Sequence, residues 1–309
     1  MRGGFKKLSY LVQYGLVRIF VFLINLIPFS LVLPLARPLG SLLFLVSKRQ
    51  RKIALENLHR SFQTEKSEAE IQNIARGTFN HLAEFGIEWL RMPKMIRRPE
   101  HYFIGGQGFE HMHQALKKAR KGAILLVCHI GNWEVMALPV SQFLAKPVCV
   151  PIYAIARPLK NPYLYRYVVK VRGGLGLRTI DKSGGVRETF DRLRKENAIV
   201  CILIDQRVSE GNVEVNLFGR PALTTALPAI TALRIGSPIF FNFLYRTSDC
   251  RYEMKLEGPF PIERTGDFKQ DIQVNTQRFV NRVEEEIKKD PAQWLWMHNR
   301  WRVPHGAKD

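Results

Sequence analysis

Residues 123–134 read AILLVCHIGNWE, an aliphatic run of six residues followed by a polar turn. Short aliphatic runs without charges are typical of strands that are buried on both faces of a sheet. Gly131 is the flexible residue that a tight turn needs, and Asn132 is a favoured residue at the start of a helix. The stretch therefore predicts a buried strand that ends at His129 and turns into a helix at Asn132.

Runs of the same kind recur along the chain, and helical patterns separate them. Buried strands are predicted at residues 123–128, 148–153, 198–204 and 238–245, and an alternating run at 251–257 indicates an edge strand. Apolar residues at helical spacing predict helices at 48–60, 67–91, 108–120, 185–196, 222–235 and 270–289. This alternation favours an α/β fold with a mostly parallel central sheet flanked by helices.

Chemically active side chains follow three of these runs, at the point where each predicted strand ends. They are His129 and Glu134 after the first run, Arg157 after the second, and Asp205 with Gln206 after the third. In open α/β sheets, ligands bind beyond the carboxyl ends of the strands. The sequence therefore predicts a site at this edge of the sheet.

The predicted catalytic pair is His129 and Glu134. A histidine titrates near neutral pH and can remove a proton from a hydroxyl group. A carboxylate on its other ring nitrogen fixes the tautomer and stabilises the imidazolium that forms. The alternative is that His129 is a hydrogen-bonded core histidine and Glu134 a residue of the first helical turn. Because the chain has no GxSxG motif, we expect direct activation of a substrate hydroxyl rather than a covalent enzyme intermediate.

The N-terminal region differs from the rest of the chain. Residues 19–36 carry no formal charge, although Pro28 and Pro34 are expected to interrupt a continuous helix. Residues 1–60 contain ten lysines and arginines against a single acid, Glu56. This pattern favours a segment that enters a membrane with an anionic surface, whereas a secretory signal peptide and a buried core helix are the alternatives. We expect a membrane anchor at residues 1–47 and one catalytic domain at residues 48–309.

The net charge is the unusual feature of the composition. There are 47 lysines and arginines against 27 acids, which gives +20, so an anionic partner is expected. No known nucleic-acid-binding motif is present, and we therefore expect no nucleic-acid partner. The four cysteines are far apart, which argues against a disulfide framework and against a zinc site.

Five motifs in a fixed order carry a resemblance to a known family. They are HxxxxE at 129–134, RPLKNP at 157–162, DQ at 205–206, LFGRPA at 217–222 and WMHNRWR at 296–302. In this order and at these spacings, the chain resembles the lipid A biosynthesis acyltransferases, the lauroyl and myristoyl transferases. They belong to the wider lysophospholipid acyltransferase superfamily that is marked by HxxxxD/E.

The resemblance implies an enzyme of the inner membrane whose catalytic domain faces the cytoplasm. It would transfer a fatty acyl chain from acyl carrier protein to a hydroxyl group of a Kdo-bearing lipid A precursor, an anionic glycolipid. His129 would be the general base and Glu134 its orienting partner. The residues expected to bind substrate are Arg157, Asp205, Gln206 and Asn132. No metal or other cofactor is expected, because a thioester already provides a good leaving group.

Other interpretations remain open at this point. The same chemistry could serve another acceptor, such as a lysophospholipid, a mannosylated phosphoinositide or an aminolipid. A protein of a different class, a basic membrane-tethered binding protein, would also explain the charge. The tryptophans 294, 296 and 301 are either the end of a core helix or a cluster that faces lipid or the active site.

Overall fold

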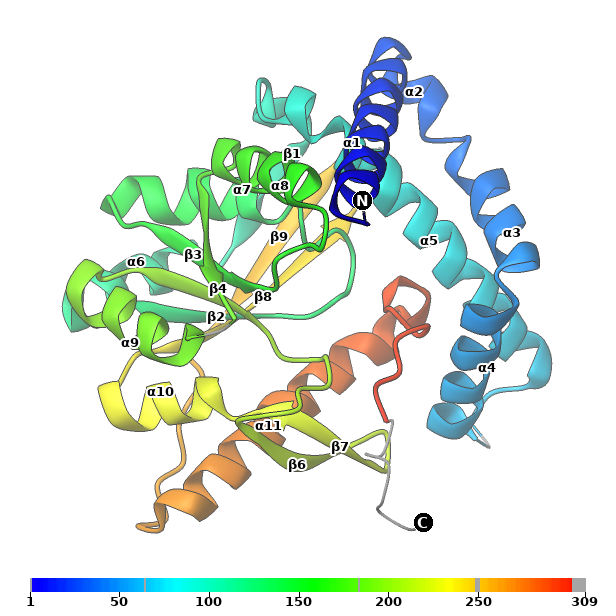
Figure 1. Ribbon diagram of the computed structural model, residues 1–309. Helices are drawn as coiled ribbons and strands as arrows, with labels where there is room; N and C mark the ends of the chain where they lie inside the picture. The colour runs from blue at the N-terminus through cyan, green and yellow to red at the C-terminus, as the bar shows by residue number, and fades with distance from the viewer. Residues whose placement is uncertain (1, 64, 183, 248–250, 302–309) are drawn as a thin grey trace.

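The computed structural model describes residues 2–63, 65–182, 184–247 and 251–301. At its centre is a seven-stranded sheet with the strand order β1-β9-β8-β2-β5-β3-β4 (Figure 1). Neighbouring strands are parallel, except that β8 and β9 are antiparallel. The strands are β1 (Phe103–Gln107), β2 (Ala123–Val127), β3 (Ile152–Ala156), β4 (Leu177–Asp181), β5 (Ile199–Leu203), β8 (Ile239–Arg246) and β9 (Tyr252–Glu257). The predicted α/β class with a mostly parallel sheet is confirmed.

Helices cover both faces of the sheet. In β2, Ile124 and Leu126 point into one apolar core, whereas Leu125 and Val127 point into the other. The first core is completed by α9 (Gly185–Glu196), α10 (Leu227–Ile235) and α11 (Phe268–Lys289), and the second by α6 (Phe109–Ala119) and α8 (Pro162–Gly174). Because both faces are buried, the central strands read as continuous apolar runs in the sequence.

The N-terminal helices wrap around one side of this core (Figure 1). They are α1 (Arg2–Leu26), α2 (Phe29–Val32), α3 (Ala36–Val46), α4 (Lys48–Phe62) and α5 (Glu68–Met95). Helix α1 ends just before Pro28, which confirms the predicted interruption. Among the residues that the structure describes, the helix long and apolar enough to cross a membrane is Phe5–Leu26, and not the stretch at 19–36 that the sequence indicated.

Helix α5 begins at a capping box and passes beside the carboxyl end of β2. The Ser67 side chain accepts a hydrogen bond from the Glu70 backbone, and Glu70 accepts one from the Ser67 backbone. The predicted end of this helix at Pro93 is wrong, because the helix accommodates the proline and continues to Met95.

Two strand predictions need correction. The strand expected at 148–153 begins only at Ile152, because residues 146–148 form a short helical turn and Pro147 and Pro151 cannot donate to a sheet. The strand expected at an edge, β9, lies between β1 and β8. Its alternating pattern arises because one of its faces packs into the core while the other is half-buried.

A small hairpin was absent from the sequence prediction. Strands β6 (Asn212–Leu217) and β7 (Arg220–Thr225) pair in antiparallel fashion beside α11. This hairpin occupies the first residues of the helix predicted at 222–235, so that helix α10 begins at Leu227.

The structure describes three of the four cysteines. Cys128, Cys149 and Cys201 are free thiols, and Cys250 lies outside the described residues.

Candidate active site

Three adjacent parallel strands, β2, β5 and β3, end at the same edge of the sheet. His129 and Asp205 each lie two residues beyond a strand, and Arg157 directly follows β3. After His129 the chain turns at Gly131, whose φ is +61°. A Cβ atom at this position would lie 2.3 Å from the carbonyl oxygen of Leu244, so the turn requires glycine. The topology thus brings these strand-end residues together.

The carboxylate that contacts His129 is Asp205. The Nδ1–H group of His129 donates to Oδ1 of Asp205 at 2.8 Å, and the backbone N–H of His129 donates to Oδ2 at 2.7 Å. The indole Nε1–H of Trp294 donates to the same Oδ2 at 2.8 Å. Burial favours a raised pKa for Asp205, but the His129 charge and these donors outweigh it and lower the pKa to about 2. Asp205 is therefore ionised at neutral pH.

The other ring nitrogen of His129 faces Gln206. The Nε2 atom of His129 lies 2.9 Å from Nε2 of Gln206. Because Nδ1 donates to Asp205, the neutral imidazole carries its lone pair on Nε2, where the Gln206 amide can donate to it. The same lone pair can accept a proton from a hydroxyl group that displaces the amide.

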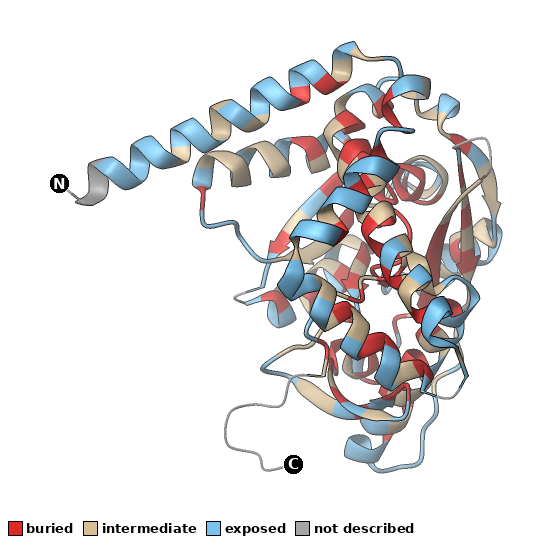
Figure 2. Cartoon of the chain, turned by 90° about the vertical axis from the view of Figure 1, so that its right-hand side faces the viewer, coloured by how far each residue is buried: buried red, intermediate tan, exposed pale blue. Residues whose placement is uncertain are grey.

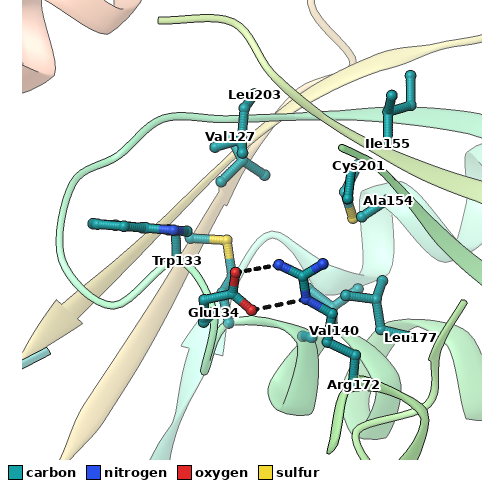
Figure 3. A pocket seen from close by; sticks show the side chains of 13 residues that line it. Val127, Trp133, Glu134, Val140, Ala154, Ile155, Arg172, Leu177, Cys201 and Leu203 are labelled. Carbon is teal, nitrogen blue, oxygen red and sulfur yellow. Dashed lines mark hydrogen bonds and ion pairs between the residues drawn. The ribbon is translucent and has the colours of Figure 1, made fainter. Parts of the chain in front are cut away.

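Glu134 does not contact His129 through a hydrogen bond, contrary to the predicted pairing. Its two oxygens accept from Arg172, with Nε–Oε2 at 3.0 Å and Nη2–Oε1 at 2.5 Å (Figure 3). The five-residue spacing explains the difference, because the intervening turn at Gly131 sends Glu134 toward helix α8 rather than back to the imidazole. Asp205, which the sequence indicated as a substrate-binding residue, instead holds the position predicted for Glu134.

Asn132 has a structural role in this loop. It is completely buried, its Nδ2 donates to Glu88 Oε2 at 2.7 Å, and its Oδ1 accepts from the Val135 backbone at 3.1 Å. The predicted helix does not begin at Asn132, because residues 133–136 form a turn and α7 (Ala137–Pro139) follows it. Asn132 caps this turn and is too buried to contact substrate. The prediction that Asn132 binds substrate is therefore wrong.

Helix α5 contacts the loop that carries His129 through buried hydrogen bonds. His81 Nε2 lies 3.1 Å from the carbonyl oxygen of Gly131, and burial, together with the nearby Arg246 charge, lowers the pKa of His81. His81 is thus neutral and donates to this carbonyl. Glu88, which is fully buried, also accepts from Arg246 at 2.7 and 3.0 Å. These contacts fix the backbone that carries His129.

A cleft opens at His129 and leads to an apolar pocket. The cleft walls include Phe85, Trp89, Arg157 and Gln206. The pocket lies between the sheet and the chain after Trp133, and Glu134 and Arg172 line both spaces (Figure 3). The remaining pocket walls are apolar: Val127, Met136, Ala137, Val140, Ala154, Ile155, Ala156, Leu177, Cys201 and Leu203. The geometry joins a basic imidazole to a space that is suited to a hydrocarbon chain.

Sequence reasoning missed two residues of the site. Arg172 lies at the end of α8, within a glycine-rich stretch that gave no sign of a partner 38 residues away. Trp294 belonged to a recognised cluster, yet its hydrogen bond to Asp205 depends on how the C-terminal segment folds back. The cluster of tryptophans was the feature of the sequence that could have indicated Trp294 as a residue of the site.

Among the residues that the structure covers, no group of three or more His, Cys, Asp or Glu side chains could hold a metal ion. A neutral imidazole with an ionised carboxylate on Nδ1 can deprotonate an alcohol or activate water.

Comparisons with known proteins agree with this chemistry. A family model described as bacterial lipid A biosynthesis acyltransferase matches residues 2–303. The phosphatidylinositol mannoside acyltransferase of Mycolicibacterium smegmatis is 26% identical over 236 residues, which cover 74% of this chain and 72% of that protein. The protein of the same name from Mycobacterium tuberculosis (strain CDC 1551) is 28% identical over 232 residues, or 71% of this chain and 68% of that protein. Because the family model spans almost the whole chain, this protein belongs to the bacterial lipid A biosynthesis acyltransferase family.

Proposed function

We propose that this acyltransferase moves a fatty acyl chain from the thioester of acyl carrier protein to a hydroxyl group of a Kdo-bearing lipid A precursor. The observation that carries the proposal is the His129–Asp205 pair, with Nδ1 and Oδ1 2.8 Å apart, at the inner end of a cleft that continues into an apolar pocket. In this proposal residues 1–47 dock the protein on the membrane, and residues 48–309 form the catalytic domain.

The proposed reaction is a direct transfer. Nε2 of His129 removes the proton of the acceptor hydroxyl while the hydroxyl oxygen attacks the thioester carbonyl carbon. The tetrahedral intermediate then collapses, the carbon–sulfur bond breaks, and the imidazolium returns the proton to the departing thiolate. Asp205 remains ionised and stabilises the imidazolium. The guanidinium of Arg157 lies in the cleft wall, where it can bind a phosphate group or the developing oxyanion.

The apolar pocket is the proposed site of the acyl chain. Glu134 and Arg172 are the charged residues of its wall, and they neutralise each other through two hydrogen bonds. An ion pair of this kind lets an uncharged chain pass beside it without meeting an unpaired charge. We therefore assign Glu134 to the pocket wall rather than to proton transfer.

A mannosylated phosphoinositide is the second candidate acceptor. The curated relatives described above are named phosphatidylinositol mannoside acyltransferases. This lipid class shares with lipid A precursors a hydroxyl group, a negative charge and a membrane location. Both acceptors therefore fit the same base and the same cationic cleft.

Membrane docking is the proposed role of the N-terminal helices, and the inner membrane is the proposed location. The outer side of α1 exposes Phe5, Leu16, Ile19 and Phe22 to between 58% and 77%. Figure 2 shows much of this helix in pale blue, interrupted by tan and red segments. Helix α3 exposes further leucines: Leu39, Leu42 and Leu45. Large apolar surfaces of this kind mark membrane or protein contacts. The basic residues nearby favour an anionic bilayer, with the catalytic domain on its cytoplasmic side.

We infer that α1 lies along the membrane surface. Its first half is held by α8, because Asn161 Nδ2 donates to the Tyr10 carbonyl at 2.9 Å. Its end is held by α5, because Arg91 donates to the carbonyls of Ile24 and Ile27 at 2.8 and 2.7 Å. A helix that crosses a bilayer is surrounded by lipid over about 20 residues. Because α1 contacts charged helices near both of its ends, we infer that it lies in the membrane–water interface and does not cross the bilayer.

One experiment tests donor and acceptor together. Purified full-length protein is mixed with palmitoyl-acyl carrier protein or palmitoyl-coenzyme A, and with either a Kdo-bearing lipid A precursor or phosphatidylinositol mannoside. Mass spectrometry then measures the acylated lipid. We expect transfer from the carrier protein to the lipid A precursor. Transfer to phosphatidylinositol mannoside alone would establish the second candidate, and equal rates with both thioesters would contradict dependence on the carrier protein.

A further inference from the structure

The C-terminal segment reaches the catalytic pair although it lies 89 residues beyond Asp205 in sequence. The backbone of Trp294 forms an antiparallel bridge with Ile130, the residue that follows His129. The indole of the same tryptophan donates from Nε1 to Oδ2 of Asp205 at 2.8 Å. A single residue therefore contacts both the loop that carries the base and the acid that orients it.

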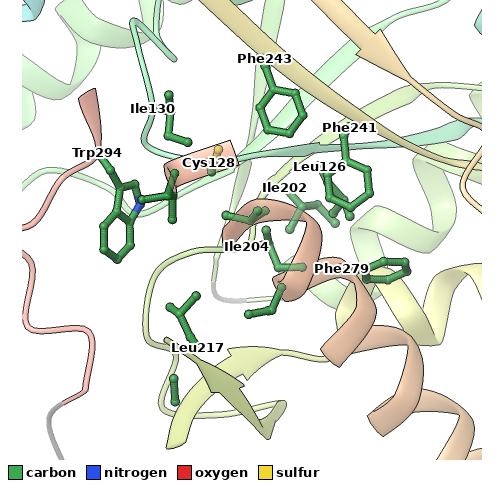
Figure 4. Packing of buried hydrophobic residues seen from close by; sticks show 14 of the residues in the cluster. Leu126, Cys128, Ile130, Ile202, Ile204, Leu217, Phe241, Phe243, Phe279 and Trp294 are labelled. Atoms are coloured by element: carbon green, nitrogen blue, oxygen red, sulfur yellow. The ribbon is translucent and has the colours of Figure 1, made fainter. Parts of the chain in front are cut away.

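The position of this indole is fixed by its surroundings. Trp294 is only 3% exposed, and it packs in an aromatic cluster whose nearest ring is Trp296, at 4.6 Å between centroids. Figure 4 shows it beside Cys128, Ile130 and Ile204, at the end of the apolar core beneath the catalytic loop. Asn57 of α4 ties the segment down, because its Nδ2 donates to the carbonyl oxygen of Trp296 at 2.8 Å. These contacts hold the indole N–H group of Trp294 in the orientation that points at Asp205.

The two oxygens of Asp205 are held by different donors. Oδ1 accepts from the His129 imidazole, whereas Oδ2 accepts from the His129 backbone and from Trp294. The terminal torsion of an aspartate is broad, so a carboxylate rotates readily unless both oxygens are held. With the indole in place, rotation would break two hydrogen bonds at Oδ2. Without it, the rotation that moves Oδ1 away from Nδ1 would break one hydrogen bond at Oδ2 instead of two.

We propose that Trp294 is a positioning residue for acyl transfer, which keeps the Asp205 carboxylate aligned with Nδ1 of His129. The proposal rests on the proposed function of the His129–Asp205 pair. Trp294 acts through Asp205 and does not touch the substrate. Trp294 therefore has a role at the site in addition to its contribution to the core.

The test compares two tryptophans of the same cluster. Trp294→Phe keeps an aromatic ring but removes the donor to Asp205. Trp296→Phe is the matched control, because Trp296 is also buried and its indole donates at 2.7 Å to the carbonyl of Pro291, away from the catalytic pair. We expect W294F to lower kcat about 10- to 100-fold with KM nearly unchanged, as for the loss of a hydrogen bond to a charged group. W296F should keep kcat within about twofold.

A double variant with Asp205 distinguishes a positioning role of Trp294 from a role in packing alone. In an Asp205→Asn background, W294F should lower kcat by no more than about twofold further, because the carboxylate that it positions is gone. Thermal melting of each variant measures the packing loss, which should be similar for W294F and W296F. Equal losses of kcat in W294F and W296F, or an undiminished effect of W294F beside D205N, would overturn the proposal.

An NMR measurement tests the role of Trp294 without enzyme turnover, so its result does not depend on the proposed function. The Nδ1 proton of His129, hydrogen-bonded to a carboxylate, should give a downfield ¹H NMR signal in the wild type. That signal should weaken or move in W294F and stay in place in W296F. If no lipid is acylated by the wild type, the proposed function fails, and this spectrum alone decides the role of Trp294. An unchanged signal in W294F would contradict it.

Discussion

The Nδ1 atom of His129 lies 2.8 Å from Oδ1 of Asp205, while Glu134, five residues beyond His129, is bound to Arg172. The two carboxylates of the site therefore have different partners and, in our account, different tasks. Asp205 orients the base and stabilises its charged form. Glu134 forms part of the wall between the cleft and the apolar pocket.

Substitutions of the two acids should separate these tasks. Asp205→Asn removes the negative charge from Nδ1 and permits the wrong imidazole tautomer, so kcat should fall by about 10²- to 10⁴-fold. Glu134→Gln should act mainly through KM for the acyl donor, with kcat reduced less than about tenfold. Steady-state kinetics with both substrates distinguishes the two results. A larger loss of kcat in E134Q than in D205N would return the orienting role to Glu134.

The ion pair of Glu134 and Arg172 predicts a non-additive double mutant. Either E134Q or Arg172→Gln leaves one partly buried charge without its partner, whereas the double variant leaves none. We expect a coupling free energy of about 1 kcal/mol or more in chemical unfolding. Additive losses would show that the pair is not a significant contact in solution.

Much of the fold could be predicted from the sequence, because its strands are buried on both faces. The run at 123–128 is uninterrupted and apolar since β2 packs against helices on either side. The order of the strands was not predictable in the same way. Placing β9 inside the sheet depends on its pairing with β1, which is about 150 residues away, and no local pattern records this pairing.

The site could be predicted only in part, for a related reason. The alignment of His129, Arg157 and Asp205 follows from parallel strands that end at one edge, and the sequence indicated all three. Which acid contacts the imidazole depends on the direction of the chain after Gly131. That direction is set by close contact with Leu244, so the five-residue spacing alone pointed to the wrong carboxylate.

The lowered pKa of Asp205 predicts a pH-dependent stability. Its folded-state value of about 2 lies below the ordinary value of 3.8, so ionised Asp205 favours the folded state. The contribution, about 2 kcal/mol, is fully present above pH 4 and is lost as the pH falls toward 2. The difference in unfolding free energy between wild type and D205N, measured in urea, should shrink between pH 6 and pH 3. A constant difference would contradict the assigned pKa.

The apolar pocket predicts control of acyl-chain length. Cys201 lies in β5 and lines this pocket, so Cys201→Phe should fill space that a long chain needs. Transfer from a hexadecanoyl donor should fall about tenfold or more relative to a decanoyl donor. Val186→Phe, which adds a ring on the exposed surface of α9, is the control and should leave the ratio unchanged. An unaltered chain-length preference in C201F would place the acyl chain elsewhere.

The exposed face of α1 predicts binding to anionic vesicles. Leu16 and Phe20 are 62% and 52% exposed on neighbouring turns, and replacing both with glutamate should weaken vesicle binding more than tenfold. Val186→Glu, at an exposed apolar residue of α9, is the matched control. Fluorophores at Leu8→Cys and Leu23→Cys should be quenched at the same shallow depth if α1 lies in the interface. Different depths would indicate a spanning helix.

The most direct measurement of the central claim is acyl transfer by wild type and His129→Ala on the same lipid acceptor, with vesicle binding and thermal melting followed in parallel. We expect H129A to keep its fold and its membrane contact and to lose at least about 10³-fold in kcat, because the group that accepts the hydroxyl proton is missing. Turnover by H129A at a rate close to that of the wild type would show that His129 is not the general base.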